Sequence, residues 1–402
     1  MRTLKVGLIG AGFMGKAHSL AYAALPMFFW PVPAIPVRAV IADVTSDLAA
    51  EAATRFGFER STDDWRRVVD DPDIDLVDIA TPNHLHAEIA AAAAAAGKHI
   101  ICEKPLARSG EEARGMYDAV RGAGIVHMVA FNYRRTPAVA LAKRYIDDGA
   151  IGRVLSFRGT YLQDWSADPD APLSWRFQKS IAGSGALGDI GTHVLDIARY
   201  LVGEVAAVNS MLSTFITDRP TALDARDKLG AAERRSDAPR GPVDVDDEVL
   251  TMLRFANGAV GSMEATRNAY GRNNYLTFEV HGSDGSIVFN YERRDELQVC
   301  FAADPPDRRG FRTVYTGPAH PYGDGLWPIP ALGIGYGETK IIEAYDLVRA
   351  IAEGTSVRPD FGDGYQVALI ADAIGESAAL DSWVPVATPD RDPVRASADG
   401  AP

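Results

Sequence analysis

The chain has 402 residues, of which 47% are hydrophobic and 24% are charged, and its formal net charge at pH 7 is −13. A chain of this length normally forms more than one hydrophobic core, so two domains are expected. The acidic balance argues against a nucleic-acid-binding protein and against binding to an anionic membrane, because both roles need a basic face.

The cysteines and the N-terminus indicate a compartment. Cys102 and Cys300 lie in apolar, strand-like runs, and neither belongs to a C-x-x-C pair. Buried thiols in a reducing compartment are therefore favoured over a disulfide scaffold or a thiolate zinc site. The N-terminus enters a strand without the apolar core of a signal peptide, and no apolar run approaches the roughly 20 residues that span a bilayer. These features predict a cytoplasmic protein.

Strands and helices alternate in the first third of the sequence. Apolar runs predict strands at residues 4–9, 37–42, 74–82, 99–102 and 125–131. Helical patterns fall between them at about 14–24, 46–56, 86–97 and 111–121. This alternation predicts a parallel sheet covered on both faces, and ligands bind beyond the carboxyl ends of the strands of such a sheet.

A glycine-rich stretch, GAGFMG, closes the first strand and opens the first helix. Gly10, Gly12 and Gly15 form the pattern G-x-G-x-x-G, with Phe13 and Met14 inside it. Glycine at these places lets main-chain N–H groups and the helix N-terminus approach a pyrophosphate. The alternative is a tight turn that holds no ligand. The context favours a dinucleotide site.

Asp43 ends the second predicted strand. A carboxylate there can accept hydrogen bonds from the ribose hydroxyls of the adenosine half of the cofactor. It would repel a 2′-phosphate, and no arginine follows directly to offset that repulsion. The inserted segment 25–36 explains the unusually long spacing from Gly10. The alternative role is a helix cap, but the pattern favours NAD over NADP.

A second group of candidate residues lies in the stretch 183–203. Helical periodicity predicts a helix from about residue 188 to 202, ended by Gly203. One stripe of this helix is apolar: Ile190, Val194, Ile197 and Leu201. A second stripe, about 95° away at 100° per residue, lies at the border of the buried region: Asp189, His193, Asp196 and Tyr200.

Asp189 and His193 are four residues apart, so their side chains can meet on one helix face. A carboxylate beside an imidazole holds its tautomer and suits a general base that works near neutral pH. The alternatives are a surface pair or a hydrogen bond at the edge of the core, and a metal site lacks an evident third ligand. With the ammonium of Lys104 facing the same cleft, these residues could take a proton from a secondary alcohol while nicotinamide takes the hydride.

The motifs GAGFMGKAH, TPNHLH, EKPLA, FNYRR, SWR and GDIGTHVLD occur in one order along the chain. In this set the sequence resembles the Gfo/Idh/MocA family, named for glucose–fructose oxidoreductase and inositol dehydrogenase. The resemblance implies an α/β fold, with an N-terminal Rossmann doubly wound parallel sheet and a C-terminal α/β domain with a large open, mostly antiparallel sheet. Hairpins predicted at Asn257–Gly258 and Asp284–Gly285 fit that second sheet.

The resemblance also suggests domain boundaries. An NAD-binding domain is expected at residues 1–133 and a substrate-binding and oligomerisation domain at 134–386. The charged, turn-rich segment 218–245 is expected to be a mobile loop. Residues 387–402 are expected to be a disordered tail. The resemblance further implies a homo-oligomer, a dimer or a tetramer, formed through the C-terminal sheet.

Site residues are carried over from the family motif by motif. Lys104 matches the lysine that contacts the reacting hydroxyl, and Asp189 and His193 match the carboxylate and the base. The expected cofactor contacts are Gly10, Gly12, Phe13, Met14, Gly15, Asp43, Thr81, Asn83, His86, Glu103, Lys104, Asn132, Trp175 and Arg176. The expected substrate contacts are Lys104, Tyr133, Gln163, Arg176, Asp189, His193 and Tyr336. His18, His84 and His86 fit cofactor-site positions, but each could equally be structural. Related segments suggest a cis Lys104–Pro105 bond.

The implied activity is an NAD-dependent dehydrogenase that oxidises a secondary hydroxyl of a sugar, with no metal. Its nearest rivals are the same chemistry on an inositol or a free aldose. NAD-dependent glycoside hydrolysis, in which the cofactor is recycled on the enzyme, is a rival of different mechanism. A redox-sensing binding protein is a rival of another class.

Overall fold

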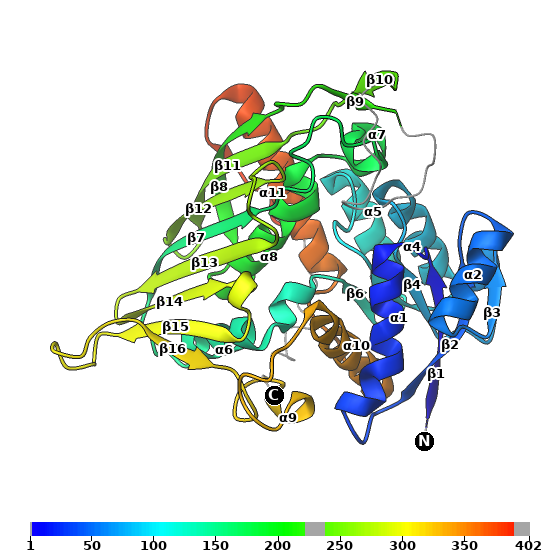
Figure 1. Ribbon diagram of the computed structural model, residues 1–402, viewed down its shortest axis with the longest axis horizontal. Helices are drawn as coiled ribbons and strands as arrows, with labels where there is room; N and C mark the ends of the chain where they lie inside the picture. The colour runs from blue at the N-terminus through cyan, green and yellow to red at the C-terminus, as the bar shows by residue number, and fades with distance from the viewer. Residues whose placement is uncertain (1, 222–237, 390–402) are drawn as a thin grey trace. The chain divides into compact units, whose positions relative to one another are not determined.

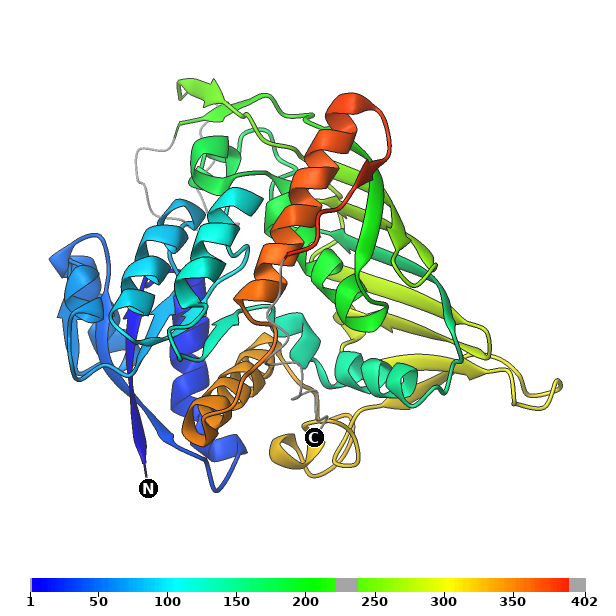
Figure 2. The same cartoon turned by 180° about the vertical axis from the view of Figure 1, so that it is seen from behind.

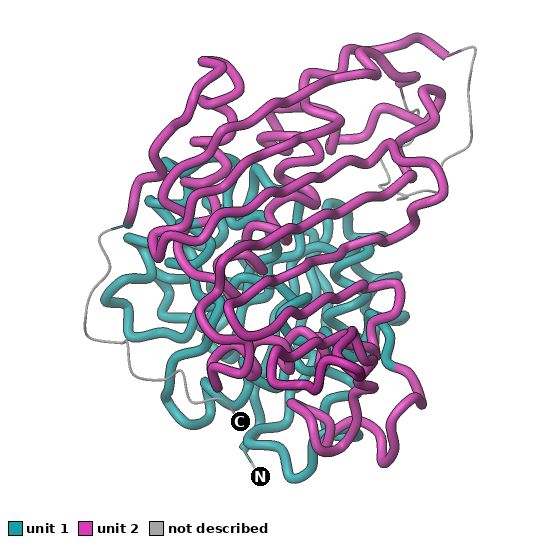
Figure 3. Tube along the Cα trace, turned by 90° about the vertical axis from the view of Figure 1, so that its left-hand side faces the viewer, with its two compact units in different colours: residues 1–135, 334–366, 389–402 teal, residues 136–333, 367–388 magenta. Residues whose placement is uncertain are grey.

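The computed structural model describes residues 2–221 and 238–389, and the chain divides into two compact units (Figure 3). Unit 1 contains residues 1–135, 334–366 and the chain from 389 on, and unit 2 contains residues 136–333 and 367–388. The sequence predicts a single boundary near residue 133, with 134–386 as one domain. The observed units differ from this because residues 334–366 return to unit 1. In the described residues, no helix is both long and apolar enough to cross a membrane.

Unit 1 is built on the predicted parallel sheet. Within the described residues it has six strands in the order β3-β2-β1-β4-β5-β6, and all its pairings are parallel. The strands are β1 (Thr3–Ile9), β2 (Ile35–Ala42), β3 (Arg60–Thr62), β4 (Leu76–Ile79), β5 (His99–Cys102) and β6 (His127–Val129). The sequence analysis did not find β3, because its three residues are polar and carry no apolar pattern.

Helices cover this sheet (Figure 1). They are α1 (Phe13–Phe28), α2 (Ser46–Phe56), α3 (Arg66–Val69), α4 (His86–Ala95) and α5 (Gly110–Val120), and α10 (Tyr336–Glu353) packs on α1. Helix α1 runs through Pro26 to Phe28, so part of the inserted segment 25–36 is helical. Helices α1 and α10 lie side by side, and the ring of Phe29 stacks on that of Tyr345 with centroids 4.1 Å apart. This packing keeps α10 in unit 1.

Unit 2 carries the large sheet that the family resemblance implies. Its described residues form nine strands in the order β16-β15-β14-β13-β7-β12-β11-β8-β17, and only β7 and β12 pair in parallel. The strands are β7 (Val154–Leu162), β8 (Val205–Ser213), β11 (Glu248–Phe255), β12 (Val260–Thr266), β13 (Tyr275–Gly282), β14 (Gly285–Asn290), β15 (Glu296–Phe301), β16 (Arg312–Tyr315) and β17 (Val384–Pro385). The hairpins predicted at Asn257–Gly258 and Asp284–Gly285 are confirmed by the antiparallel pairs β11–β12 and β13–β14.

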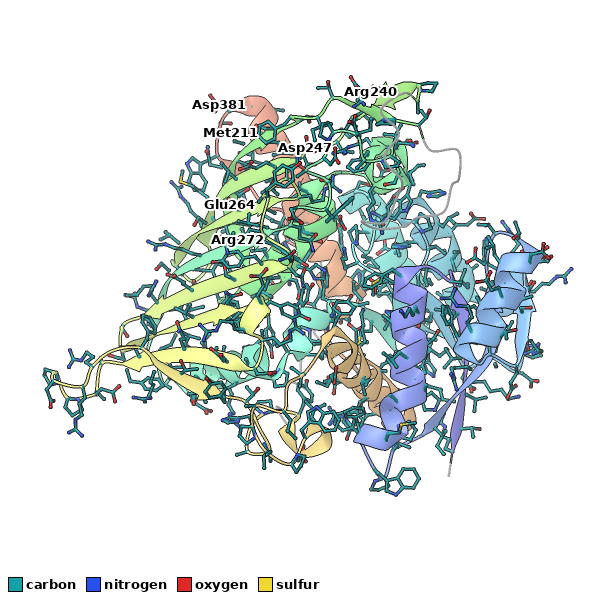
Figure 4. The ribbon with its side chains drawn as sticks, viewed as in Figure 1. Met211, Arg240, Asp247, Glu264, Arg272 and Asp381 are labelled. Atoms are coloured by element: carbon teal, nitrogen blue, oxygen red, sulfur yellow. The ribbon has the colours of Figure 1, made fainter. Side chains whose placement is uncertain are left out.

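One face of the large sheet is covered by helices of the same unit. Figure 2 shows α6 (Pro137–Asp147) and α8 (Thr192–Leu201) against it. On the opposite face, Leu250 lies between Met211 and Glu264 in the strand register, and the last two are labelled in Figure 4. Met211 is 60% exposed and Met252, on the same face, is 53% exposed. This apolar face is uncovered in the chain as described.

Part of the segment expected to be a mobile loop is ordered. Strand β9 (Asp218–Pro220) pairs with β10 (Arg240–Pro242), and residues 222–237 lie outside the described residues. The expectation of a loop over 218–245 is therefore wrong at both ends. Strand β9 is fixed because Arg219 is fully buried and donates hydrogen bonds to the main-chain carbonyls of Ser166 and Asp168.

Unit 1 buries a cluster of charged side chains next to the end of β5. The cluster contains Tyr22, Asp78, Glu103, Lys340 and Glu343 together with His18, and it joins α1, β4, the end of β5 and α10. The imidazole of His18 lies between two carboxylates, with Nδ1 2.8 Å from Asp78 Oδ2 and Nε2 2.9 Å from Glu103 Oε1. Only a doubly protonated imidazole can donate to both.

The same two carboxylates set the charge of His18. Burial alone would lower the pKa of this histidine, but the negative charge of Asp78 and hydrogen bonds to Asp78 and Glu103 outweigh burial and the opposing charge of Lys340. The pKa of His18 is raised to about 9 as a result. His18 is therefore an imidazolium at neutral pH, and it forms a structural part of unit 1.

The raised pKa predicts how stability depends on pH. A group whose pKa is higher in the folded state stabilises the fold fully below its unfolded pKa of 6.5, and this stability is lost as the pH rises through about 9. The loss is at most about 3.5 kcal/mol, since one pH unit corresponds to about 1.4 kcal/mol. We expect the melting temperature of the wild type to fall between these pH values, and that of His18→Gln to fall much less.

The matched control is His281→Gln, which removes a half-buried histidine of unit 2. Its melting curve should keep the pH dependence of the wild type. Parallel curves for the wild type and His18→Gln, measured by circular dichroism, would contradict a charged His18 in the folded state.

Candidate active site

The candidate residues fall into two groups, one in each unit. In unit 1, the glycine-rich loop lies between β1 and α1. Gly10 has φ of +102°, and a Cβ there would lie 2.5 Å from the carbonyl oxygen of Ala80. A Cβ on Gly15 would lie 2.1 Å from the carbonyl oxygen of Gly10, whereas one on Gly12 would meet nothing within 4 Å. The first and third glycines are thus required by packing, and the second leaves open space at the N-terminus of α1.

Asp43 lies directly after β2, beside this loop. Its Oδ2 accepts a hydrogen bond from the N–H of Ala11 at 2.8 Å, and its Oδ1 accepts one from the N–H of Val44 at 2.7 Å. These bonds fix a half-buried carboxylate against the glycine loop. The helix-cap role considered for Asp43 does not apply, because Thr45 is the N-cap of α2.

The residues after β4 are divided between the surface and the core. Asn83 begins the short 3₁₀ helix η1 (Asn83–Leu85), and His84 is exposed. His86 is fully buried, with Nε2 3.0 Å from the carbonyl oxygen of Thr81 and Nδ1 3.0 Å from that of Pro105. These contacts are those of a structural histidine, which is one of the two roles considered for His86, and the cofactor contact stays a prediction.

The chain leaves β5 through Glu103, Lys104 and Pro105, and the predicted cis Lys104–Pro105 bond is confirmed. Glu103 is 4% exposed, and both carboxylate oxygens accept hydrogen bonds from unit 1. Lys104 is half-buried. Glu103 is thus held inside unit 1, and the contact to the nicotinamide ribose that the family resemblance implies stays a prediction.

Three further predicted residues gather where α10 begins. The ring of Tyr336 stacks on Phe13 with centroids 5.7 Å apart, and its hydroxyl lies 3.4 Å from Met14 Sδ. The ring of Tyr133 meets it edge-on at 6.4 Å. Asn132 is buried and donates to Thr339 Oγ1 at 2.8 Å. Tyr336 thus lies beside the glycine loop, although the sequence assigned it to the substrate.

In unit 2, Asp189 and His193 lie on consecutive helical segments. Asp189 belongs to a π-helical turn, η4 (Leu187–Gly191), and His193 lies in the first turn of α8. The stretch was predicted as one regular helix, and π turns of this kind are frequent at functional sites. The predicted apolar stripe is confirmed as buried, but His193 at 6% and Asp196 at 1% exposure are buried as well.

Asp189 forms an ion pair that the sequence analysis did not find. Arg267, which is fully buried just after β12, places Nη1 3.4 Å from Asp189 Oδ2. Its guanidinium also lies 5.2 Å from the ring centroids of Trp165 and Phe177. Aromatic faces attract a cation, so the guanidinium is held in place beside the partly exposed carboxylate of Asp189.

Asp246 holds the chain just before Asp189. Its carboxylate accepts hydrogen bonds from the N–H groups of Gly185 at 2.6 Å and Leu187 at 2.7 Å, at the start of η4. Asp246, Arg219 and Arg267 are not among the residues predicted from the sequence. The acidic run before a predicted strand, VDVDDE, is a local signal for the first, but the two arginines bear no recognisable spacing to their partners.

The remaining predicted residues of unit 2 lie on neighbouring segments. Gln163 Oε1 accepts a hydrogen bond from Trp165 Nε1 at 3.0 Å, and its amide donates to Asn274 Oδ1 at 2.8 Å. Trp175 and Arg176 belong to the 3₁₀ turn η3 (Trp175–Phe177), where the guanidinium lies 4.4 Å from the centroid of the Trp175 ring.

The residues of unit 1 fit a dinucleotide. The N-cap Gly12 leaves open space, and the first turn of α1 contains no acidic side chain to compete with a pyrophosphate for its N–H groups. Asp43 supplies the acidic group expected at the end of the second strand.

Comparisons with known proteins agree with this geometry. Residues 4–131 match the oxidoreductase family with an NAD-binding Rossmann fold, and residues 139–288 match the GFO/IDH/MocA C-terminal domain. Over 386 residues the chain is 77% identical to levoglucosan dehydrogenase of Pseudarthrobacter phenanthrenivorans, which spans 96% of this chain and 99% of that protein. Inositol 2-dehydrogenase of Rhizobium meliloti is 28% identical, over 96% of this chain and 100% of its own length.

A solved structure of levoglucosan dehydrogenase in complex with NADH and levoglucosan is similar as well. It matches 96% of this chain and 100% of its own chain, with 75% identity and a TM-score of 0.92. Both halves of the sequence match the family models, and a relative of high identity spans nearly the whole chain. The chain therefore belongs to the GFO/IDH/MocA family of oxidoreductases.

Proposed function

We propose that this protein is an NAD-dependent dehydrogenase that oxidises levoglucosan at one secondary hydroxyl, giving 3-keto-levoglucosan. The observation that carries the proposal is the 77% identity to levoglucosan dehydrogenase over nearly the full length of both proteins. The sequence also resembles levoglucosan dehydrogenase in three particular stretches, residues 17–31, 160–190 and 325–344. When bound, NAD supplies the hydride acceptor, while the side chains of this chain bind the sugar and move the proton.

Lys104 and Asp43 have separate tasks in this reaction. The ammonium of Lys104 binds the reacting hydroxyl and stabilises its oxygen as negative charge develops there. Asp43 binds the adenosine ribose and disfavours a 2′-phosphate by charge repulsion. The open space at Gly12 receives the pyrophosphate.

His193 is the proposed base, and Asp189 supports it. The hydroxyl must lose its proton as its carbon loses a hydride, and a neutral imidazole accepts that proton. Asp189 favours the imidazolium that forms, and Arg267 holds Asp189 in place through the 3.4 Å ion pair. Arg267 is therefore a positioning residue, since it acts through Asp189.

We further propose that the protein acts in the cytoplasm as a homo-oligomer, a dimer or tetramer. Cys102 and Cys300 are free thiols, as is usual in a reducing compartment. The face of the large sheet that carries Met211 and Met252 offers exposed apolar side chains for a second copy. Such a face is costly to leave in water, which supports association through this sheet.

The first prediction concerns the substrate and the cofactor. Purified protein with levoglucosan and NAD should accumulate NADH, with a higher kcat/KM than for myo-inositol or glucose, and NADP should be the poorer acceptor because of Asp43. Release of a free sugar without net NADH would instead identify a glycoside hydrolase. Asp43→Ala should narrow the preference for NAD, and a wild type that uses NADP equally well would contradict the role of Asp43.

The second prediction concerns Lys104 and His193. His193→Ala should lower kcat by ~10²–10⁴, which is the usual contribution of a general base. Lys104→Ala should lower kcat at least as much, because it removes both positioning and charge stabilisation. Neither change should greatly raise the Kd for NAD measured by fluorescence. In the wild type, the rate should rise with pH as the imidazole loses its proton. A His193→Ala enzyme with near-normal kcat and the same rising pH limb would rule out His193 as the base.

The third prediction concerns Arg267. Arg267→Met removes the cation beside Asp189 but preserves much of the packing against Trp165. We expect kcat to fall about tenfold or more with an unchanged KM for NAD, because charge-assisted hydrogen bonds contribute about 1.5–3 kcal/mol. Arg267→Lys, which restores the charge, should recover part of the loss. Equal kcat values for the wild type and a folded Arg267→Met protein would show that Asp189 works without this pair.

A further inference from the structure

Helix α10 carries a buried lysine that contacts the residue next to Lys104. We propose that Lys340 is a positioning residue for catalysis: it holds Glu103, and Glu103 in turn holds the main chain of Lys104. The proposal rests on the proposed role of Lys104 in sugar oxidation. It assigns a function to a residue 236 positions further along the chain, which no motif connects to the reaction.

The first step is the contact between Lys340 and Glu103. Lys340 is 1% exposed, and its Nζ lies 2.8 Å from Glu103 Oε1, 2.9 Å from Glu343 Oε2 and 3.1 Å from His18 Nε2. An ammonium has three N–H donors and no acceptor. With His18 charged, Lys340 donates to the two carboxylates, and its approach to the imidazolium is balanced by the three surrounding acids.

The second step is the contact between Glu103 and Lys104. Glu103 Oε2 accepts a hydrogen bond from the main-chain N–H of Lys104 at 3.1 Å, while Oε1 is occupied by Lys340 and His18. Both oxygens of one carboxylate are thus engaged, so its plane is fixed. The main-chain N–H of Lys104 is thus linked to α10 through two contacts in series, first to Glu103 and then from Glu103 to Lys340.

The turn is also held on its other side. The ring of His86 lies 3.0 Å from the carbonyl oxygen of Pro105 and 3.3 Å from that of Leu106. The residues before and after Lys104 are therefore both fixed by buried side chains of unit 1. The proposed role of Lys104 requires a fixed main chain, because misplacement of a reacting group by about 1 Å can lower the rate ~10²-fold.

Stability alone does not account for the cluster. Burying charges is costly, and apolar side chains of similar volume often stabilise a fold as well as a buried ion pair does. What the ions supply in addition is a defined geometry around Lys104. Glu103 could instead bind the nicotinamide ribose, as the resemblance implies, and the two roles differ in which kinetic constant they affect.

The experiment uses the full-length enzyme. Lys340→Met alone leaves two carboxylates unpaired and can fail to fold, so the principal variant is the double substitution Lys340→Met/Glu343→Gln, in which His18 still pairs with Glu103. We expect kcat with levoglucosan to fall ~10²-fold, with KM for NAD within about twofold of the wild type. Glu103→Gln, which is isosteric, should give the same pattern in the folded protein. An unchanged kcat in both folded variants would overturn the proposal.

Lys98→Met is the matched control. Lys98 is also a buried lysine of unit 1, it precedes the same strand β5 at its opposite end, and it donates to the carbonyl oxygens of Asp71 and Ile74 at 2.7 and 2.8 Å. Its loss should lower the melting temperature and leave kcat unchanged. A similar fall of kcat in Lys98→Met would mean that any loss of a buried lysine weakens the enzyme, and this would overturn the specific role of Lys340.

Two further outcomes separate the possible errors. A loss seen only as a raised KM for NAD would assign Glu103 to cofactor binding and overturn the proposal. A wild type inactive on levoglucosan would refute the proposed function, and the positioning role would then be tested by crystal structures of the wild type and the double variant. The Lys104 main chain should shift in the variant, and an unmoved turn would overturn the proposal without any substrate.

Discussion

The ion pair between Lys340 and Glu103 is the interaction on which unit 1 depends. The chain leaves this unit after residue 135 and returns at residue 334, so every strand of the large sheet except β17 precedes α10 in the sequence. The 2.8 Å contact between Lys340 and Glu103 joins the returning helix to the end of β5. Packing of α10 on α1 places Lys340 beside Glu103 and Glu343, and these buried acids would be left without their cation if Lys340 were displaced.

In each unit a buried cation fixes an acidic side chain near a residue that is proposed to take part in the reaction. In unit 1 a buried cation, Lys340, holds the acid that precedes Lys104. In unit 2 a buried cation, Arg267, holds Asp189, which lies one helical turn before His193. In each case a charge in the interior fixes the acid that lies near the residue proposed to meet the substrate. A low dielectric strengthens such contacts, and it also makes them costly to leave unpaired.

Much of the fold could be predicted because its signals are local. Apolar runs mark β1 and β5, the turn chemistry of Asn257–Gly258 marks a hairpin, and the glycine pattern marks the loop before α1. The strand β3 has no apolar run, and its polar residues pair with β2 only because the sheet is already there. The return of α10 depends on contacts between residues hundreds of positions apart, and periodicity in a single stretch carries no information on them.

The same limit explains the assignment of Glu103. The family resemblance implies separate contacts for these two residues, with Glu103 at the cofactor and Lys104 at the reacting hydroxyl. Side chains alternate along an extended chain, so two consecutive residues cannot both continue toward the same side. The hydrogen bond from the N–H of Glu103 to the carbonyl of Ile79 extends the β5 ladder by one residue, and this places the carboxylate among His18 and Lys340. The motif therefore combines a residue that anchors the turn inside unit 1, Glu103, with a residue for which we propose a contact with the substrate, Lys104.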